Sequence, residues 1–586
     1  MSKASVKSPP SIPSKSVSIV SQGKGGEDDD EFKTNPDFIY GGPFITVEKP
    51  SPLLGTSTPI NMQLQGTFKK SFAYYSLVER LPIILTKVID YCSRESGSIR
   101  SSCGASDGDL RSFINYVSKL KNDLITNKKY ELLQVDTPEA KKWNEWIEGS
   151  PNQYYFTNIW VFTECYVYRR LREGCELYKT LATFDPFQEQ KSEAFNSTLE
   201  PMCVVADKLM TMLPESDKDK RKADFVTLMK ICLWANKCDL SLSVGDQVKL
   251  QDNEHTTGIM DPFQMITDLK DKLLVDDTGK AADQIITKAE NMAKTIEGAS
   301  VTAVTPVASK AATAEGGEEP EPPKIPCPAK MTIPQAVMFD IVCDNAGYEL
   351  FADLCLAHFL VSQKIVQKVR FHVKKIPWFV SDVTPKDFQY VIDQCRSARY
   401  DKKVPQAPKP DAAEGEAPPE PLVVSADNLH RLGDQWTQYV ADGIFIVMSD
   451  DFWTSPHVYK DMKKYDYNLY RKLQYAVAIM FKGDLNYRKL LGERNCSSVL
   501  GFEAALQGFI PAPILAVRTV KAELICGLPK GKADQISKID PDWMRKGDYG
   551  VIHFCPKAEP LKVADRPCLD YGDKCRGTIC PTHNDL

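Results

Sequence analysis

Residues 336–347, AVMFDIVCDNAG, contain the transition that decides the fold of this chain. The run is apolar up to Cys343, is interrupted by Asp340, and passes directly into the polar turn Asp344-Asn345-Ala346-Gly347. A short apolar run that ends in turn residues favours a buried strand. After the turn, apolar residues recur at helical spacing at Leu350, Leu354, Ala357 and Val361. This succession of strand, turn and helix predicts the first unit of an α/β sheet.

Further β-rich runs follow and alternate with amphipathic helices, which is typical of a parallel sheet with crossover helices. One such helix is expected to begin at Thr384-Pro385, a hydroxyl N-cap followed by proline at the first helical position. We therefore predict an α/β fold, with a three-layer α/β/α (Rossmann-like) domain over residues 331–555. Its other strands are expected at 369–373, 443–448, 476–481, 514–517 and 551–554.

The first half of the chain follows a different pattern. Segments 159–171 and 225–233 have helical periodicity without the alternation of half-buried strands. A further segment places five apolar residues on one helical face, and residues 60–298 are therefore predicted to form a mainly helical N-terminal domain. The five residues are Leu110, Phe113, Val117, Leu120 and Leu124.

Four segments have compositions that do not support a packed core. Residues 1–35 are rich in Ser, Lys and Pro and are predicted to form a disordered tail. The Pro-, Glu- and Ala-rich residues 299–330 are predicted to be a linker, and residues 403–423 a flexible insertion within the α/β domain. Residues 556–586 form a C-terminal extension.

Composition limits the classes of function. The chain has 586 residues and a formal net charge of −5, so no bulk positive field attracts nucleic acid or an anionic membrane. Its N-terminus has no apolar signal-like region, and no apolar stretch is long enough to span a bilayer. We expect a cytoplasmic protein with a small-molecule substrate. The oligomeric state stays open.

Polar residues follow several predicted strands at the point where each strand ends. Asp344 and Asn345 follow the first strand, Asp382 comes after the second, and Arg518 and Lys521 follow the run at 514–517. Because ligands of open α/β sheets bind outside the carboxyl ends of the strands, we expect these side chains to meet. Singly, each has an ordinary structural explanation as a turn, a loop or a solvated pair; together they favour a site.

The residue types at these strand ends suit a metal and a phosphate. Carboxylate and amide oxygens are hard ligands for Mg²⁺, Mn²⁺ or Co²⁺, so Asp344, Asn345 and Asp382 are the expected metal ligands and catalytic residues. Arg518 and Lys521 match phosphate oxygens. His358 and His372 lie within a helix and a strand pattern, and we interpret both as structural.

Six segments resemble the eukaryotic branch of the damage-control phosphatase family, a branch also associated with protein-glutamate (acidic residue) O-methyltransferase activity. The matches occur in family order, and the Arg-Thr-x-Lys signature is specific to this branch. The segments are SFAYYSLVERLPIILTKVID (71–90), LWANKCDLSLS (233–243), DNAGYELFADL (344–354), IPWFVSD (376–382), FKGDLNYRKL (481–490) and RTVKAE (518–523).

The resemblance implies a divalent metal, Mn²⁺, Co²⁺ or Ni²⁺ with Mg²⁺ as a further candidate, at Asp344, Asn345 and Asp382. It also implies hydrolysis of sugar phosphates such as fructose 1-phosphate and fructose 6-phosphate. Besides Asp344, Asn345 and Arg518, the substrate or a proposed S-adenosylmethionine is expected to contact Glu349, Asp484, Leu485, Asn486, Tyr487, Arg488 and Lys521.

The expected mechanism has a metal that binds a phosphoryl oxygen and positions water, while Lys521 and Arg518 neutralise charge in the transition state. Asp344 or Asp382 could deprotonate the water. A carboxylate nucleophile is less favoured, because no strand end carries an Asp-x-Asp signature. The main alternative is S-adenosylmethionine-dependent methylation of protein glutamates, which the lack of a Gly-rich turn after the first strand disfavours. A non-catalytic scaffold ranks last, because the site motifs are intact.

Overall fold

The computed structural model describes residues 50–214, 217–236, 261–304, 336–404 and 422–560, and the described residues all belong to one unit that begins at Thr46. The predicted tail, most of the predicted linker and C-terminal extension, and the centre of the predicted insertion lie outside the described residues. The domain boundaries given above therefore stay predictions.

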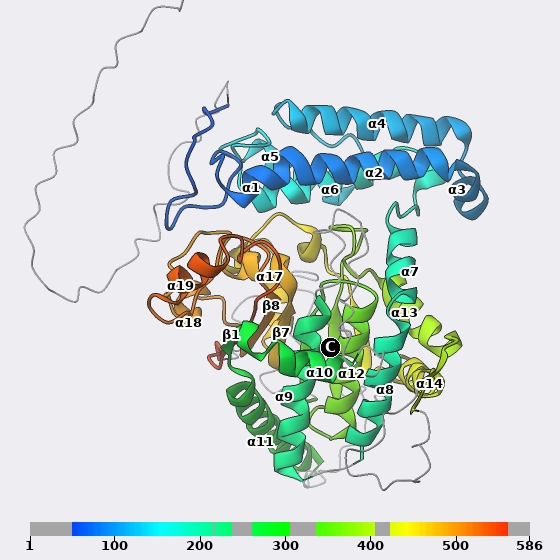
Figure 1. The fold of residues 1–586 in the computed structure, drawn as a ribbon, viewed down its shortest axis with the longest axis vertical. Coiled ribbons are helices and arrows are strands. Elements are labelled where there is room, and N and C mark those ends of the chain that lie inside the picture. The colour runs from blue at the N-terminus through cyan, green and yellow to red at the C-terminus, as the bar shows by residue number, and fades with distance from the viewer. Residues whose placement is uncertain (1–49, 215–216, 237–260, 305–335, 405–421, 561–586) are drawn as a thin grey trace, which may run out of the picture. The chain divides into compact units, whose positions relative to one another are not determined.

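A seven-stranded sheet forms the centre of the described structure (Figure 1). Its strand order is β1-β9-β8-β7-β2-β3-β6. Neighbouring strands are parallel except β8 and β9, which pair antiparallel. The strands are β1 (Leu273–Asp276), β2 (Met338–Val342), β3 (Lys368–His372), β6 (Phe445–Met448), β7 (Ala476–Lys482), β8 (Ile514–Thr519) and β9 (Gly550–Cys555).

All six strands predicted from the sequence are present, and the predicted α/β fold with helical regions is confirmed. Three strands were not predicted. Strand β1 is an edge strand with only three apolar residues, Leu273 to Val275, which is shorter than the apolar run of a buried strand. Strands β4 (Asp401–Val404) and β5 (Leu422–Ser425) form a separate antiparallel pair on either side of the predicted insertion.

Side chains from alternate positions of the strands enter two different hydrophobic cores. Phe339 and Met480 pack in the first core with helices α8, α9, α11, α12, α13 and α14. Val342 and Phe481 pack in the second core with α16, α17 and the helices of the N-terminal part. The sheet therefore lies between two helical layers. The helices of the first layer are α8 (Leu199–Met212), α9 (Lys218–Ala235), α11 (Thr278–Val304), α12 (Tyr348–Ser362), α13 (Pro385–Ser397) and α14 (Asp427–Ala441).

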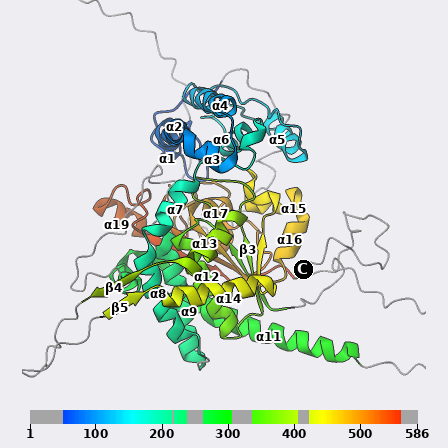
Figure 2. The same ribbon diagram turned by 90° about the vertical axis from the view of Figure 1, so that its right-hand side faces the viewer.

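Figure 2 shows most of the first layer, with α8, α9, α12, α13 and α14 close together and the long helix α11 below them. Helix α13 begins as predicted: Thr384 Oγ1 accepts a hydrogen bond from the Asp387 amide, and the Asp387 carboxylate accepts one from the Thr384 amide. The remaining helices of this half are α15 (Met462–Tyr465), α16 (Tyr467–Leu473), α17 (Gly483–Leu490), α18 (Phe502–Ala505) and α19 (Lys532–Ile539).

The N-terminal part of the described chain is helical, and its helices α2 and α4 lie side by side (Figure 1). All five residues predicted on one face of α4 are buried. Helix α6 is buried on nearly every side, including its charged residues Glu164, Arg169, Arg170 and Glu173. The helices are α1 (Phe72–Tyr75), α2 (Leu81–Arg94), α3 (Ser96–Cys103), α4 (Asp107–Ile125), α5 (Pro138–Glu148), α6 (Trp160–Glu176), α7 (Gln188–Asn196) and α10 (Pro262–Asp268), with a π-helical turn at Ser76–Arg80.

Candidate functional site

The direction of the chain through the sheet defines where a ligand would bind. From β2 the chain proceeds to β3 and β6 on one side, and from β7 to β8 on the other. Strands β2 and β7 are neighbours, so the strand order reverses between them. In open α/β sheets this reversal opens a crevice at the carboxyl ends of the two strands. The predicted site residues follow these strand ends.

Asp344 and Asn345 lie in the turn between β2 and α12, and Gly347, with φ of 70°, leads the chain into the helix. Asp344 Oδ2 accepts hydrogen bonds from the side-chain amides of Asn236 at 2.8 Å and Asn345 at 3.2 Å. The same two amides donate to Glu349 Oε2 at 2.7 and 2.8 Å. All these side chains are buried. Two predicted metal ligands and the predicted substrate residue Glu349 therefore form one hydrogen-bonded group.

Asp382, which follows β3, lies opposite Asn345 in an isolated antiparallel bridge. Ser381 Oγ donates a hydrogen bond of 2.6 Å to Asn345 Oδ1. The ammonium of Lys374 is 3.4 Å from Asp382 Oδ2 and donates to the Cys343 carbonyl at 3.2 Å. The structure thus brings the three predicted metal ligands to one edge of the sheet, with a buried lysine beside the third.

Gly483, directly after the end of β7, packs against the carboxylate of Asp344. Gly483 has φ of 82°, and a Cβ at this position would lie 1.7 Å from Asp344 Oδ2. Any side chain here would displace the carboxylate, and the left-handed conformation also favours glycine. Lys482, the preceding residue, places its ammonium 2.9 Å from Glu349 Oε1 and 2.8 Å from Asp353 Oδ1. Glycine at 483 is therefore required for the observed position of Asp344.

Asp484 joins the end of β7 to the end of β8. Its Oδ1 accepts hydrogen bonds from Arg518 Nε at 2.8 Å and from the Lys521 amide at 3.2 Å. The other two Arg518 nitrogens donate to the carbonyls of Leu524 and Ala522. Through these contacts Arg518 fixes the turn that contains Lys521. Its contact with phosphate stays a prediction.

Asn236, the residue after α9, connects the two groups, and sequence reasoning missed it. Its side-chain amide donates to Asp344 and Glu349, its Oδ1 accepts from Thr519 Oγ1, and its carbonyl accepts from Lys521 Nζ at 2.8 Å. It lies within the segment LWANKCDLSLS, which resembles the family but from which no role for Asn236 was predicted. That resemblance is the signal in the sequence that could have indicated its place in the site.

The other predicted substrate residues of α17 make different contacts. Asn486 donates to the Lys482 carbonyl at 2.7 Å and supports the end of β7. Leu485 and Tyr487 pack in the second hydrophobic core. Arg488 is buried in ion pairs with Glu493 and with Glu164 of α6. Within this segment Asp484 contacts both Arg518 and Lys521, and the Tyr487 ring lies 4.3 Å from the Arg518 guanidinium.

Burial changes the proton affinities around the site. Burial raises the pKa of Asp353 to about 6, although Lys482 opposes the shift. Burial by itself would lower the pKa of Lys482, but the carboxylates of Asp353 and Glu349 outweigh it and hold this pKa well above its usual range. Burial lowers the pKa of Lys489 to about 8, and its ammonium donates to the Ser455 carbonyl at 2.7 Å. Lys374 and Asp382 are among the charges that act on Lys489. Sequence analysis predicted neither Lys374 nor Lys489.

The donor set at the strand ends fits a hard divalent cation. Within the described residues, no three His, Cys, Asp or Glu side chains gather as a metal site. The predicted set instead combines two carboxylates, Asp344 and Asp382, with the amide of Asn345. Such oxygen donors suit Mg²⁺ or Mn²⁺ with water in the remaining positions, whereas zinc prefers His or Cys.

The two histidines interpreted as structural make contacts away from this edge. His358 Nδ1 accepts a hydrogen bond of 3.1 Å from the Trp436 indole, so its ring is neutral, and burial lowers its pKa to about 4. His372 lies 3.3 Å from Asp340 in the middle of the sheet.

Among the described helices, none has the length and apolar character needed to cross a membrane.

Comparison with known proteins gives a consistent result. A family model described as "Damage-control phosphatase ARMT1-like domain" matches residues 76–297 and 329–536. Damage-control phosphatase ARMT1 of Danio rerio is 33% identical over 503 residues, which cover 84% of this chain and 96% of the relative. The Bos taurus protein of the same name is 33% identical over 83% of this chain and 96% of its own. The Homo sapiens protein is 31% identical over 84% and 98%.

Proposed function

Since the chain belongs to the damage-control phosphatase ARMT1-like domain family, we propose that it is a metal-dependent phosphatase that hydrolyses phosphorylated metabolites. Family membership supports a phosphatase in metabolite damage control. Dependence on a divalent metal and preference for sugar phosphates, such as fructose 1-phosphate and fructose 6-phosphate, are the finer parts of the proposal.

One observation supports the proposal most directly: Asp344, Asn345 and Asp382 meet at the reversal of strand order between β2 and β7. Asn236 then connects this acidic group to the ammonium of Lys521. A cation site beside a lysine suits a phosphate monoester, which needs positive charge on its oxygens.

In this proposal Asp344, Asn345 and Asp382 hold Mn²⁺, Co²⁺, Ni²⁺ or Mg²⁺. When bound, the ion supplies polarisation of the phosphoryl group and a source of activated water. Glu349 and Asn236 fix the carboxylate of Asp344 through their shared hydrogen bonds. Lys374 holds Asp382 from the other side.

Lys521 is placed to neutralise charge on the phosphoryl oxygens, and Asp484 with Arg518 holds the turn that presents it. Asp344 or Asp382 accepts a proton from the attacking water. The water oxygen forms a bond to phosphorus and the bond from phosphorus to the ester oxygen breaks. The proton taken from the water passes from the carboxylate to the ester oxygen, so that the products are inorganic phosphate and the alcohol.

The test is a screen of the purified full-length chain against a panel of phosphorylated metabolites, with Mn²⁺, Co²⁺, Ni²⁺ and Mg²⁺ supplied separately. We expect release of inorganic phosphate from sugar phosphates, with Asp344→Ala as the inactive matched control. If no substrate of the panel releases phosphate with any of the four metals, and the protein instead transfers methyl groups from S-adenosylmethionine to protein glutamates, the proposal is wrong.

A further inference from the structure

The turn that delivers Asp382 to the site has an unusual backbone. Phe379 has φ of 45° and Val380 has φ of 71°. Among the residues that the structure describes, these are the only two consecutive non-glycine residues with positive φ. A β-branched residue such as valine is a genuine outlier in this region. Such a conformation persists only where the surrounding structure holds it.

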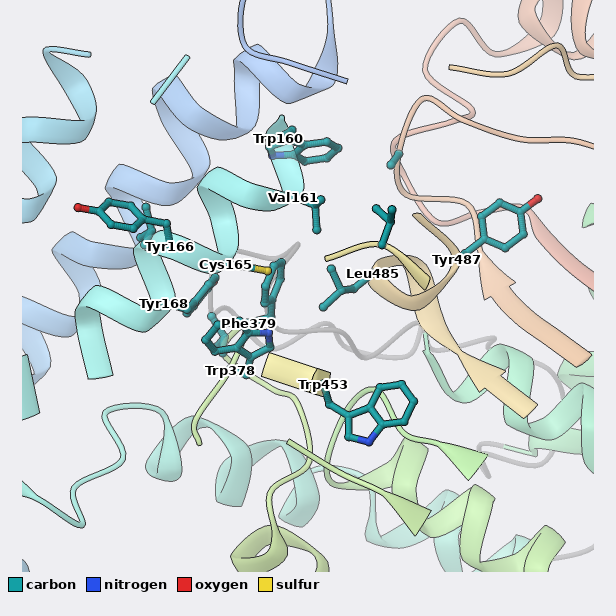
Figure 3. Close-up of a cluster of buried hydrophobic side chains, with 14 of the residues drawn as sticks. Trp160, Val161, Cys165, Tyr166, Tyr168, Trp378, Phe379, Trp453, Leu485 and Tyr487 are labelled. Carbon is teal, nitrogen blue, oxygen red and sulfur yellow. The ribbon is translucent and has the colours of Figure 1, made fainter. Parts of the chain in front are cut away.

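Helix α6 supplies a contact that can hold this turn. The Tyr168 ring stacks on the Phe379 ring, with centroids 4.7 Å apart and planes 24° apart, and lies 6.0 Å from the Trp378 ring. Figure 3 shows Tyr168 on α6 beside Phe379 and Trp378. All three rings are buried. The strained turn therefore has an aromatic partner from a helix more than two hundred positions earlier in the sequence.

The strained turn determines where the following residues meet β2. The Asp382 amide donates to the Trp378 carbonyl at 3.1 Å, which closes the turn. The Ser381 carbonyl then accepts from the Ala346 amide at 2.7 Å. An extended backbone at Phe379 and Val380 would break these contacts and move Asp382 away from Asn345.

Helix α6 also contacts the other side of the site. Glu164, one turn before Tyr168, pairs with Arg488 of α17 at 2.7 Å and with Arg80 at 2.6 Å. The Arg488 guanidinium lies over the ring of Trp160, the first residue of α6, at 3.5 Å. One buried helix thus braces the segment after β3 and the helix after β7.

From this geometry we propose that Tyr168 is a positioning residue: it holds the left-handed Phe379-Val380 turn and thereby the backbone of Asp382 opposite Asn345. The importance of Asp382 rests on the proposed function, whereas the bracing itself does not. Its ring contacts with Phe379 and Trp378 lie within the turn, and through them Tyr168 acts on the position of Asp382.

The experiment compares Tyr168→Leu with Tyr168→Phe and with the matched control Tyr166→Leu. Tyr166 lies on the same helix and is equally buried, but it packs against Tyr130 and Tyr155. Hydrogen exchange of residues 376–383 is measured in the metal-free full-length protein, and Mn²⁺ binding is measured by calorimetry. Tyr168→Leu is expected to speed exchange of this segment at least about tenfold and weaken Mn²⁺ binding about tenfold.

Tyr168→Phe keeps the stacked ring and should match the wild type, and Tyr166→Leu should leave the segment protected even where it lowers overall stability. Adding Val380→Gly to Tyr168→Leu should restore part of the protection, because glycine adopts positive φ without strain. A cavity left by a merely structural tyrosine would not be repaired by that change.

Two results would overturn the inference: unchanged exchange of residues 376–383 in Tyr168→Leu, or equal loss of protection in Tyr166→Leu. If Tyr168→Leu does not fold, Phe379→Leu removes the same stack from the other side and is judged by the same exchange measurement. Hydrogen exchange is measured without metal or substrate. A full-length chain that releases no phosphate would therefore contradict the proposed function, whereas the test of the Tyr168 contact would stay valid.

Discussion

Strands β2 and β3, together with the segments that follow them, bring two polar clusters into the structure, and the two clusters differ in kind. In the middle of the strands, Asp340 of β2 faces Arg370 of β3, with two contacts of 2.7 Å, and His372 lies 3.3 Å away. Although burial raises it, Arg370 and His372 hold the pKa of Asp340 below its usual range. This central cluster pairs one carboxylate with one guanidinium.

At the carboxyl edge, in the segments that follow these strands, the balance of charge is different. The hydrogen bonds to Asp344 Oδ2 come from the neutral amides of Asn236 and Asn345. Asp382 and Glu349 add further carboxylates, and the contacts come from segments spread over the whole chain. Burial alone therefore does not separate a structural cluster from a candidate site; position at the strand ends and the source of the partners do.

The largest effect is expected at the edge. Asp344→Ala and Asp382→Ala should each lower phosphate release at least about a thousandfold, because each removes one of the proposed oxygen ligands. Asp344→Ala should stay folded, because removing one carboxylate from an acidic group relieves like-charge repulsion. Asp382→Ala also takes a carboxylate away from the buried ammonium of Lys374, so some loss of stability is expected there. Elemental analysis for metal, circular dichroism and phosphate release from fructose 1-phosphate with Mn²⁺ make the test. A folded variant with wild-type turnover would show that the carboxylate at the edge, like Asp340 in the central cluster, is not needed for catalysis.

The central cluster should respond in the opposite way. Asp340→Ala leaves the buried guanidinium of Arg370 without its carboxylate, which is expected to cost about 3–5 kcal/mol of unfolding free energy. Protein that remains folded should keep its metal content and its turnover. Chemical denaturation measures the loss, with metal analysis on the same samples. A loss of metal at full stability would place Asp340 with the site instead.

The sequence allowed the strands and their polar ends to be predicted because both signals are local. Apolar runs marked β2, β3 and β7, and polar residues of the segments that follow these strands are neighbours at one edge. Strand β1 was missed because its apolar run has only three residues, Leu273 to Val275, between charged neighbours.

Other parts of the site depend on contacts that no local pattern contains. Asn236 reaches Asp344 from 108 positions earlier, at the end of a helix whose sequence gives no polar motif. The positive φ of Val380 contradicts the preference of valine for extended backbone, so propensity would have excluded it. Both features arise from tertiary packing, which the sequence encodes only through the fold as a whole.

Among the residues at the carboxyl edge, Lys521→Ala separates substrate binding from metal binding. It should raise KM for a sugar phosphate about 10- to 100-fold, because a charge-assisted hydrogen bond contributes about 1.5–3 kcal/mol. Metal content should be nearly unchanged, since the nearest described partner of the ammonium is the Asn236 carbonyl. Lys538→Ala, an exposed lysine on α19, is the matched control. Equal loss of metal in Lys521→Ala would contradict this role.

Helix α12 repeats the comparison on a smaller scale, because Glu349 in its first turn contacts the site whereas His358 further along pairs with Trp436. The pKa of His358 is about 4 in the folded protein because of burial, against about 6.5 unfolded. The unfolded chain therefore binds the proton more readily. The resulting stability is fully present above pH 6.5 and is lost as the pH falls from 6.5 toward 4.

His358→Asn should remove this contribution, because the asparagine oxygen can accept the Trp436 hydrogen bond but does not titrate in this range. Between pH 6.5 and 4 the unfolding free energy of the wild type should fall more steeply than that of the variant, by about 1.4 kcal/mol per pH unit. Above pH 7 the two curves should run parallel, which separates titration from any constant cost of the substitution. Urea denaturation at several pH values measures both. If the two curves run parallel across the whole pH range, the fold does not hold His358 neutral. That result would contradict the structural role given to His358 on α12.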